Sequence, residues 1–134
     1  MLQIRDHMSR LTHSLSPQLG LAEALDRLHQ ADSSGLPVLD DQKRLIGFLS
    51  EQDCIPSLLT GSYHCDSRTR VEELMSRTPL FVSPDDSILD LARQMTGAKP
   101  KIYPVREGDK VVGIINRRQV MQALNAQMKQ CQAT

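Results

Sequence analysis

The sequence repeats itself, and this repeat constrains the fold more than any other feature. Residues 4–10 align with residues 71–77, and both segments end in Met-Ser-Arg. Further matches follow along the chain: Ser16-Pro17 with Ser83-Pro84, Pro37-Val38 with Pro104-Val105, and Gly47 with Gly113. Each half has about 60 residues and little surface to bury alone. We therefore expect the halves to pack against each other about a pseudo-twofold axis, with equivalent clefts between them.

Each half predicts a helix after its Ser-Pro pair. Apolar residues recur there at the spacing of one helix face: Leu21, Ala24, Leu25 and Leu28 in the first half, and Ile88, Leu91, Ala92 and Met95 in the second. Proline is well placed near a helix start, where its missing N–H has no partner to lose. Asp85 and Asp86 favour the positive end of the second helix.

A hairpin and a second helix follow in each half. Strands are predicted over 36–39 and 45–49 around the polar turn 40–43, and over 103–105 and 111–115 around the turn 107–110. The second helices are predicted over about 51–59 and 117–128. With a short strand expected at the start of each half, the order is β-α-β-β-α in both halves, which predicts a mixed α/β (α+β) fold. The expected organisation is repeat one over 1–60, a polar linker over 61–70, and repeat two over 71–134.

Composition excludes several classes of protein. Lys plus Arg and Asp plus Glu both number 16, so the chain lacks the basic field of a general nucleic-acid binder. No segment approaches the roughly 20 apolar residues that span a bilayer, and we expect no signal peptide. Three widely spaced cysteines argue against a disulfide framework and favour the cytoplasm.

The hairpin motifs resemble those of the cystathionine-β-synthase (CBS) domain. Residues 35–40 fit the pattern Gly-x-Pro-Val-apolar-Asp. Residues 45–53 fit two apolar residues, Gly, two apolar residues, Ser or Thr, any two residues, and Asp. Two copies in tandem resemble a CBS pair (Bateman module), and we expect a stand-alone pair of the bacterial type. The resemblance implies a non-catalytic regulatory module that binds AMP, ADP, ATP or S-adenosylmethionine between its repeats. It also implies a homodimer and an unidentified regulated protein.

One cleft is expected to use Asp53. The resemblance implies that the Asp53 carboxylate accepts hydrogen bonds from the ribose hydroxyls. It also implies that Ser50 lies near the ribose or phosphate. From spacing alone, Ser50 and Asp53 also fit a helix cap, and both roles can coexist. The loop before the strand over 36–39 contains Asp32, whose negative charge would repel an anion. The full set implied for this cleft is Ser33, Ser34, Gly35, Ser50, Asp53, Thr78, Pro79, Pro100 and Lys101.

The second cleft departs from the family pattern. Asn116 stands where the first repeat has Ser50, and Gln119 stands where it has Asp53. Because glutamine carries no charge, its bonds to ribose hydroxyls should be weaker. We therefore expect unequal sites. The implied set for the weaker cleft is Thr12, His13, Ile102, Asn116 and Gln119.

Other motifs predict little chemistry. His64 and Cys65 are adjacent, whereas structural zinc sites use spaced pairs, so we expect no metal. Cys65 and Cys131 lack a resolving partner at Cys-x-x-Cys spacing, and Cys54 should pack as a small apolar residue. No catalytic motif is present, so we expect neither an enzyme nor a cofactor. The alternative function is a structural or protein-interaction module with vestigial nucleotide clefts.

Overall fold

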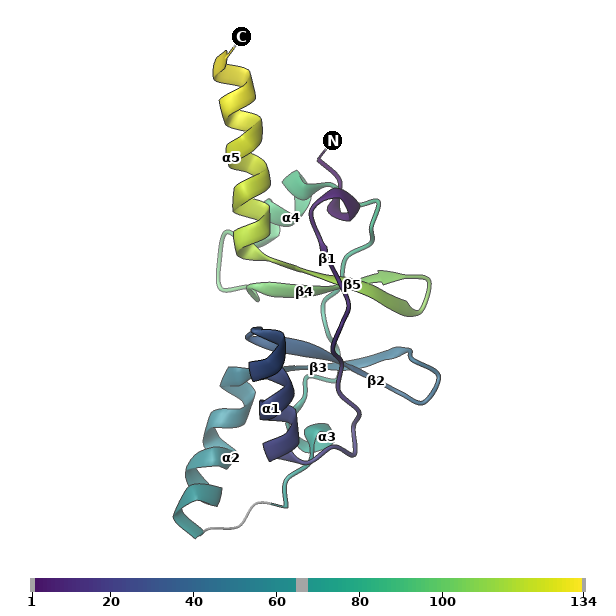
Figure 1. Cartoon of the computed structure of the whole chain (residues 1–134), viewed down its shortest axis with the longest axis vertical. Coiled ribbons are helices and arrows are strands. Elements are labelled where there is room, and N and C mark those ends of the chain that lie inside the picture. The colour runs from purple at the N-terminus through teal and green to yellow at the C-terminus, as the bar shows by residue number, and fades with distance from the viewer. Residues whose placement is uncertain (1, 65–67, 134) are drawn as a thin grey trace. The chain divides into compact units, whose positions relative to one another are not determined.

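The computed structural model describes residues 2–64 and 68–133. The first repeat contains a 3₁₀ helix and five elements (Figure 1): Ile4–Asp6, then β1 (Ser9–Arg10), α1 (Leu21–Ala31), β2 (Gly35–Leu39), β3 (Leu45–Ser50) and α2 (Glu51–His64). The second repeat contains α3 (Val71–Leu74), α4 (Ile88–Gln94), β4 (Ile102–Glu107), β5 (Lys110–Asn116) and α5 (Arg117–Ala133). The predicted mixed α/β class is confirmed.

The two repeats exchange their opening segments. One compact unit, here called the first-repeat unit, consists of Thr12–Pro79 with Asp109–Val111. The other, the second-repeat unit, consists of Met1–Leu11, Leu80–Gly108 and Val112–Thr134. The start of each repeat thus belongs to the unit built around the other repeat. The compact units differ in this respect from the expected division into 1–60 and 71–134.

Matching backbone hydrogen bonds hold the exchanged segments. Ile4 N–H donates to the Asp86 carbonyl and Val71 N–H donates to the Leu19 carbonyl, both over 2.9 Å. Two further bonds repeat the arrangement: Arg5 N–H to the Pro84 carbonyl at 2.9 Å, and Glu72 N–H to the Pro17 carbonyl at 3.0 Å. The duplication seen in the sequence therefore extends to individual backbone contacts.

The Ser-Pro pairs do not start the helices as we expected. α1 begins at Leu21 and α4 at Ile88, four residues after each proline. The prolines lie in turns, and their carbonyl groups accept hydrogen bonds from backbone N–H groups of the opening segments. Each helix begins only after this pairing of turn and opening segment. Ser87 then caps α4, with its hydroxyl accepting from Leu89 N–H at 3.1 Å.

Asp85 and Asp86 serve the same turn rather than the first turn of α4. Asp85 forms an ion pair with Arg5 of the exchanged segment. The Asp86 carboxylate accepts from Ser83 N–H at 2.8 Å. The expectation that these residues stabilise the helix start is therefore wrong; Asp90 is the acidic residue in that turn.

Each hairpin belongs to its own sheet. β2 and β3 pair antiparallel, with Gly35 opposite Ser50 and Val38 opposite Gly47. In the second-repeat unit the strand order is β1-β5-β4, because exchanged β1 pairs with β5 and places Ser9 opposite Ile114. The equivalent pairing in the first-repeat unit is a single bridge between Ser76 and Phe48.

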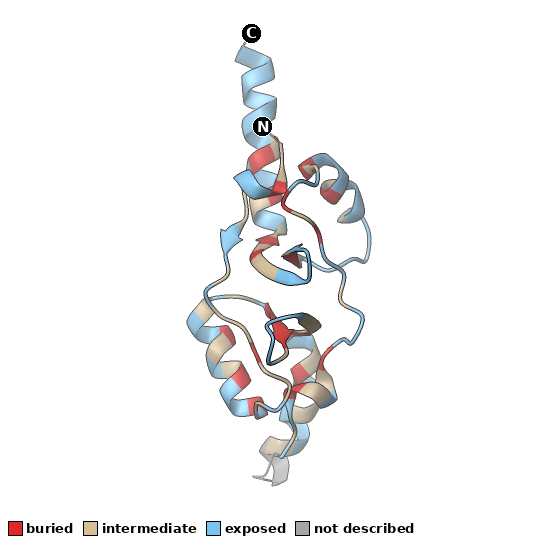
Figure 2. Ribbon diagram, turned by 90° about the vertical axis from the view of Figure 1, so that its right-hand side faces the viewer, coloured by how far each residue is buried: buried red, intermediate tan, exposed pale blue. Residues whose placement is uncertain are grey.

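Helices cover one side of each hairpin (Figure 1). α1 buries Leu21, Ala24 and Leu28, and its buried positions recur at helical spacing (Figure 2). The core of the second-repeat unit has these buried members: Ile4, Val82, Ile88, Leu91, Tyr103, Val105, Ile115, Val120 and Ala123. Two helices run beyond their expected ends, since α2 reaches His64 within the predicted linker and α5 reaches Ala133. No helix in the described ranges has the length and apolar character needed to cross a membrane.

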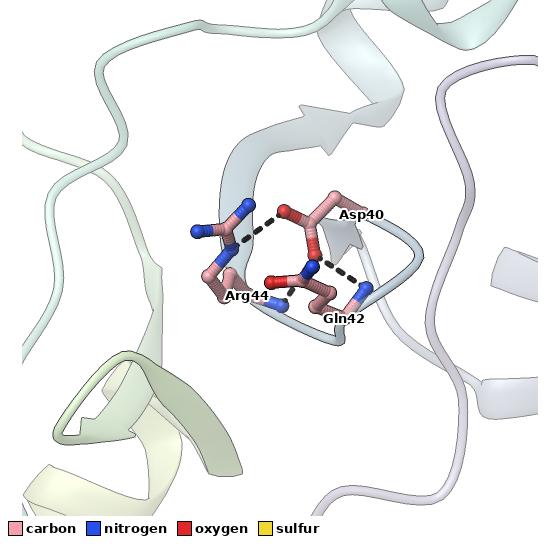
Figure 3. Close-up of polar contacts among 3 residues, drawn as sticks. All are labelled: Asp40, Gln42 and Arg44. Carbon is pink, nitrogen blue, oxygen red and sulfur yellow. Dashed lines mark hydrogen bonds and ion pairs between the residues drawn. The ribbon is translucent and has the colours of Figure 1, made fainter.

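The β2–β3 turn is held by one carboxylate (Figure 3). One oxygen of Asp40 accepts from the backbone N–H groups of Gln42 and Arg44, at 2.9 and 2.8 Å. Its other oxygen accepts from Arg44 Nε at 2.8 Å. These bonds, first that from the Arg44 backbone, lower the pKa of Asp40. Lys43 adopts a left-handed φ of 64° inside the same turn.

Candidate functional site

The junction of β3 and α2 brings Ser50 and Asp53 together. β3 ends at Ser50 and α2 begins at Glu51. The Asp53 Oδ2 atom accepts from both the backbone N–H and the hydroxyl of Ser50, each at 3.0 Å. In return, Asp53 N–H donates to the Ser50 hydroxyl at 3.4 Å. The two residues form a reciprocal helix cap, so the capping alternative is confirmed.

The Asp53 carboxylate keeps one acceptor atom available. Asp53 is half-buried. Within residues 2–64 and 68–133, both hydrogen bonds that its carboxylate accepts end on Oδ2. Oδ1 therefore remains able to accept a hydrogen bond from a hydroxyl group, while Oδ2 fixes the orientation of the side chain.

The loop before β2 lies against the same helix start. The Ser34 carbonyl accepts from Glu51 N–H at 2.9 Å. Gly35 is opposite Ser50 in the sheet, where an added Cβ would meet the Leu49 carbonyl at 3.1 Å. The Ser33 hydroxyl donates back to the Gly35 carbonyl at 2.6 Å, so it stabilises its own turn. The structure thus brings five predicted site residues together: Ser33, Ser34, Gly35, Ser50 and Asp53.

Charge at this helix start is predominantly negative. Glu51 and Asp53 both lie in the first turn of α2. They offset the favourable effect of the helix dipole on an anion. The junction is therefore better suited to accept hydrogen bonds from neutral hydroxyls than to bind a phosphate by itself.

The second repeat builds the same cap with amide side chains. Asn116 N–H donates to Gln119 Oε1 at 2.9 Å, and Gln119 N–H donates to Asn116 Oδ1 at 2.8 Å. Gln119 Nε2 donates in addition to the Ser9 hydroxyl at 2.7 Å. Both polar atoms of the Gln119 side chain thus have protein partners, which is the main difference from Asp53.

The loop before β4 repeats the loop before β2. Arg117 N–H donates to the Lys101 carbonyl at 2.8 Å, the counterpart of the bond between Glu51 and Ser34. Ile102 begins β4 and is half-buried. Asn116, Gln119 and Ile102 of the predicted weaker site therefore gather at one end of the second-repeat unit.

The remaining predicted contacts stay predictions. Thr78 is exposed and forms no hydrogen bond to Ser50 or Asp53 among the described residues, and Pro79 follows it in the first-repeat unit. Pro100 and Lys101 belong to the second-repeat unit, whereas Asp53 belongs to the first-repeat unit. Thr12 and His13 lie in the first-repeat unit, where their side chains contact each other at 3.0 Å.

Ser9 was not among the predicted site residues. Sequence reasoning placed it in its own repeat, whereas the exchange of segments carries it to the start of α5. The available signal was the alignment of Met8-Ser9 with Met75-Ser76, which marks both segments as equivalent parts of the fold.

Cys54 lies beside the first site but supplies no nucleophile. Its side chain is fully buried, and its thiol faces the Ser50 carbonyl at 3.4 Å. Burial, followed by the negative charges of Asp53 and Glu51, raises the pKa of the Cys54 thiol to about 11. The prediction that Cys54 packs as a small apolar residue is confirmed. Cys65 lies outside the described residues.

Comparison with known proteins supports both repeats. The CBS domain family model matches residues 4–59 and 71–126. The structure of CBSX2 of Arabidopsis thaliana in complex with AMP is 28% identical, with a TM-score of 0.81, over 96% of this chain and 99% of that one. A putative acetoin utilization protein (AcuB) from Vibrio cholerae shares the fold, with a TM-score of 0.82 at 24% identity, over 100% of this chain and 98% of that one.

A curated relative contains the same region within a longer protein. Protein YtoI of Bacillus subtilis is 29% identical over 119 residues, which are 88% of this chain. The chain spans about a quarter of the length of that relative. With both family matches placed on duplicated hairpins and capped helices, the chain belongs to the CBS domain family and is a tandem CBS pair.

Proposed function

We propose that the chain is a regulatory module that binds an adenosine-containing metabolite reversibly at Asp53. The observation that carries this proposal is the Asp53 carboxylate, oriented through Oδ2 while Oδ1 has no hydrogen-bond partner in the described part of the chain. A ribose hydroxyl donating to this oxygen would form a charge-assisted hydrogen bond. The AMP complex of CBSX2, at 28% identity, supports a nucleotide as the ligand class.

The phosphate group needs other contacts. Because Glu51 and Asp53 make the α2 start acidic, we expect the phosphate to be bound by a cation outside this junction. We expect the nucleotide to leave unchanged; the neighbouring Cys54 thiol is buried, and its raised pKa means that it offers no nucleophile at neutral pH. The ligand acts by shifting the equilibrium between two states of the protein.

The partners proposed are a second copy of the chain and a regulated protein. On α2, Ile55 is 51% exposed and Leu59 is 70% exposed. On α5, Met121 is 62% exposed. These side chains would be stabilised by burial in an assembly. The same observation favours the second candidate function, an interaction module that does not respond to nucleotide.

Titration calorimetry tests the ligand site. AMP, ADP, ATP and S-adenosylmethionine are titrated separately into the protein and into Asp53→Asn. This variant retains an acceptor for the cap and removes the charge, so we expect at least about tenfold weaker binding. The matched control is Glu51→Gln, which removes a neighbouring exposed charge and should not weaken binding. Heat from none of these ligands, or equal affinity of Asp53→Asn, would contradict the proposal.

Light scattering distinguishes the second candidate function. The mass of the protein is measured without ligand and with each of AMP, ADP, ATP and S-adenosylmethionine. A dimer of constant mass, together with no binding heat, would favour the interaction module. A nucleotide-dependent change in mass or shape supports the regulatory module.

A further inference from the structure

We infer that the Ser9 hydroxyl blocks the Gln119 site by forming a hydrogen bond with the Gln119 side chain, so that only the Asp53 site binds an adenosine-containing ligand. This inference rests on the proposed function of Asp53. Its basis is the 2.7 Å hydrogen bond from Gln119 Nε2 to the Ser9 hydroxyl. No equivalent bond joins the corresponding residues Asp53 and Ser76 in the described structure.

The two caps use one side-chain atom in the same way. Asp53 Oδ2 and Gln119 Oε1 each accept the backbone N–H of the residue three positions earlier, at 3.0 and 2.9 Å. The second atom differs in chemistry. In Asp53 it is an acceptor oxygen, whereas in Gln119 it is a donor nitrogen. A ligand hydroxyl that donates would find an acceptor only at Asp53.

Side-chain length makes the difference larger. Glutamine has one more methylene group than aspartate, and Gln119 uses this reach to contact Ser9. Ser9 and Ser76 hold matching positions, since Ser9 pairs with Ile114 and Ser76 with Phe48. The Ser9 hydroxyl thus takes the place at Gln119 that a ligand hydroxyl could take at Asp53.

The exchanged segment keeps Ser9 in this position. Ser9 belongs to β1, and the next residue, Arg10, is opposite Gly113. A Cβ at Gly113 would lie 2.5 Å from the Ser9 carbonyl oxygen, so the strands pack closely here. A ligand at Gln119 would have to displace a hydrogen bond that the fold already holds in place.

The stoichiometry of AMP binding, measured by calorimetry, tests the inference. We expect one AMP per chain for the natural sequence and two for Gln119→Asp, which supplies a free acceptor and no longer reaches Ser9. Ser9→Ala leaves the cap intact and frees Gln119 Nε2, so we expect it to add a weaker second binding event. Two equal sites in the natural sequence would overturn the inference, as would one site in both variants.

A stability measurement tests the Ser9 contact without ligand. Ser9→Ala should lower the urea midpoint of the natural sequence and leave that of Gln119→Asp unchanged. Ser76→Ala is the matched control and should change neither background. Equal effects of Ser9→Ala in both backgrounds would overturn the inference. Failure of the proposed function has a separate signature: none of AMP, ADP, ATP and S-adenosylmethionine binds the natural sequence, or the ligand that binds has equal affinity for Asp53→Asn.

Discussion

Gly113 lies directly against the carbonyl group of Ser9. A Cβ built on Gly113 would lie 2.5 Å from the Ser9 carbonyl oxygen, closer than real Cβ atoms approach another atom. Gly47 has the same relationship with the other exchanged segment, where a Cβ would meet the Ser76 carbonyl oxygen at 2.9 Å. The glycine in each hairpin motif is therefore required by close packing of the opposite repeat's opening segment.

Gly113→Ala should destabilise the second-repeat unit. The added methyl group would meet the fixed β1 backbone, and overpacking of this kind costs about 2 kcal/mol or more in the free energy of unfolding. Urea denaturation followed by circular dichroism measures this loss. Gly97→Ala is the matched control, because a Cβ at Gly97 has no neighbour within 4 Å. Equal midpoints for the two variants would show that β1 is not held closely against β5.

This close packing marks the limit of what the sequence could predict. The repeat, the hairpin strands and the apolar faces of the helices follow from local patterns, and the structure confirms them. The exchange of opening segments involves partners far apart in the chain, such as Ile4 and Asp86. Periodicity carries no information on which hairpin a short strand joins, so the compact units could not be derived from it.

The candidate site divides in the same way. Spacing alone indicated the cap between Ser50 and Asp53, because both residues belong to one helix start. The resemblance added a ligand role for Asp53, and the departure at Gln119 predicted unequal sites. The contact between Gln119 and Ser9 required the exchanged fold, since 110 positions separate these residues.

Asp40→Asn should remove an acid-sensitive part of the stability of the β2–β3 turn. Hydrogen bonds, first that from the Arg44 backbone, lower the pKa of Asp40 in the folded protein. A lowered pKa stabilises the fold above the unfolded-state pKa, and this contribution is lost as the pH falls through the folded-state pKa. Urea midpoints measured from pH 7 to pH 3 should therefore fall less steeply for Asp40→Asn.

Asp41→Asn is the matched control for this measurement. Asp41 is the next residue in the same turn, is exposed, and forms no hydrogen bond through its side chain in the described structure. It should retain the acid dependence of the natural sequence. If Asp40→Asn retained it as well, the contacts in Figure 3 would not stabilise the turn in solution.

Cys54 should be unreactive toward a thiol reagent in the folded protein. Its side chain is buried, and its pKa is raised to about 11, so little thiolate is present at neutral pH. A variant with Cys65→Ser and Cys131→Ser leaves Cys54 as the remaining thiol of the three. We expect reaction with a disulfide reagent to be slow in buffer and fast in urea. Equally fast reaction in buffer would contradict the buried position.

The same thiol predicts a loss of stability in alkali. Because the folded-state pKa is about 11 and the ordinary value is 9.0, the unfolded chain releases this proton first as the pH rises. The stabilising contribution is complete below the ordinary value and is lost as the pH rises through the interval between the two. In Cys54→Ala this part of the alkaline dependence should disappear. An unchanged slope of urea midpoint against pH would show that Cys54 ionises equally in both states.

Tyr103 places a hydroxyl group in the core of the second-repeat unit without a hydrogen-bond partner in the described structure. The side chain is 1% exposed, and burial raises its pKa. A buried polar group without a partner loses its bonds to water, so Tyr103→Phe should be neutral or stabilise the protein by about 1 kcal/mol.

Val105→Thr is the complementary variant, because it adds a hydroxyl to the same core at a fully buried position. It should destabilise the protein by about 1–3 kcal/mol. Urea denaturation of both variants measures the pair. A clear loss of stability in Tyr103→Phe would indicate that the hydroxyl has a partner in solution, such as a buried water molecule.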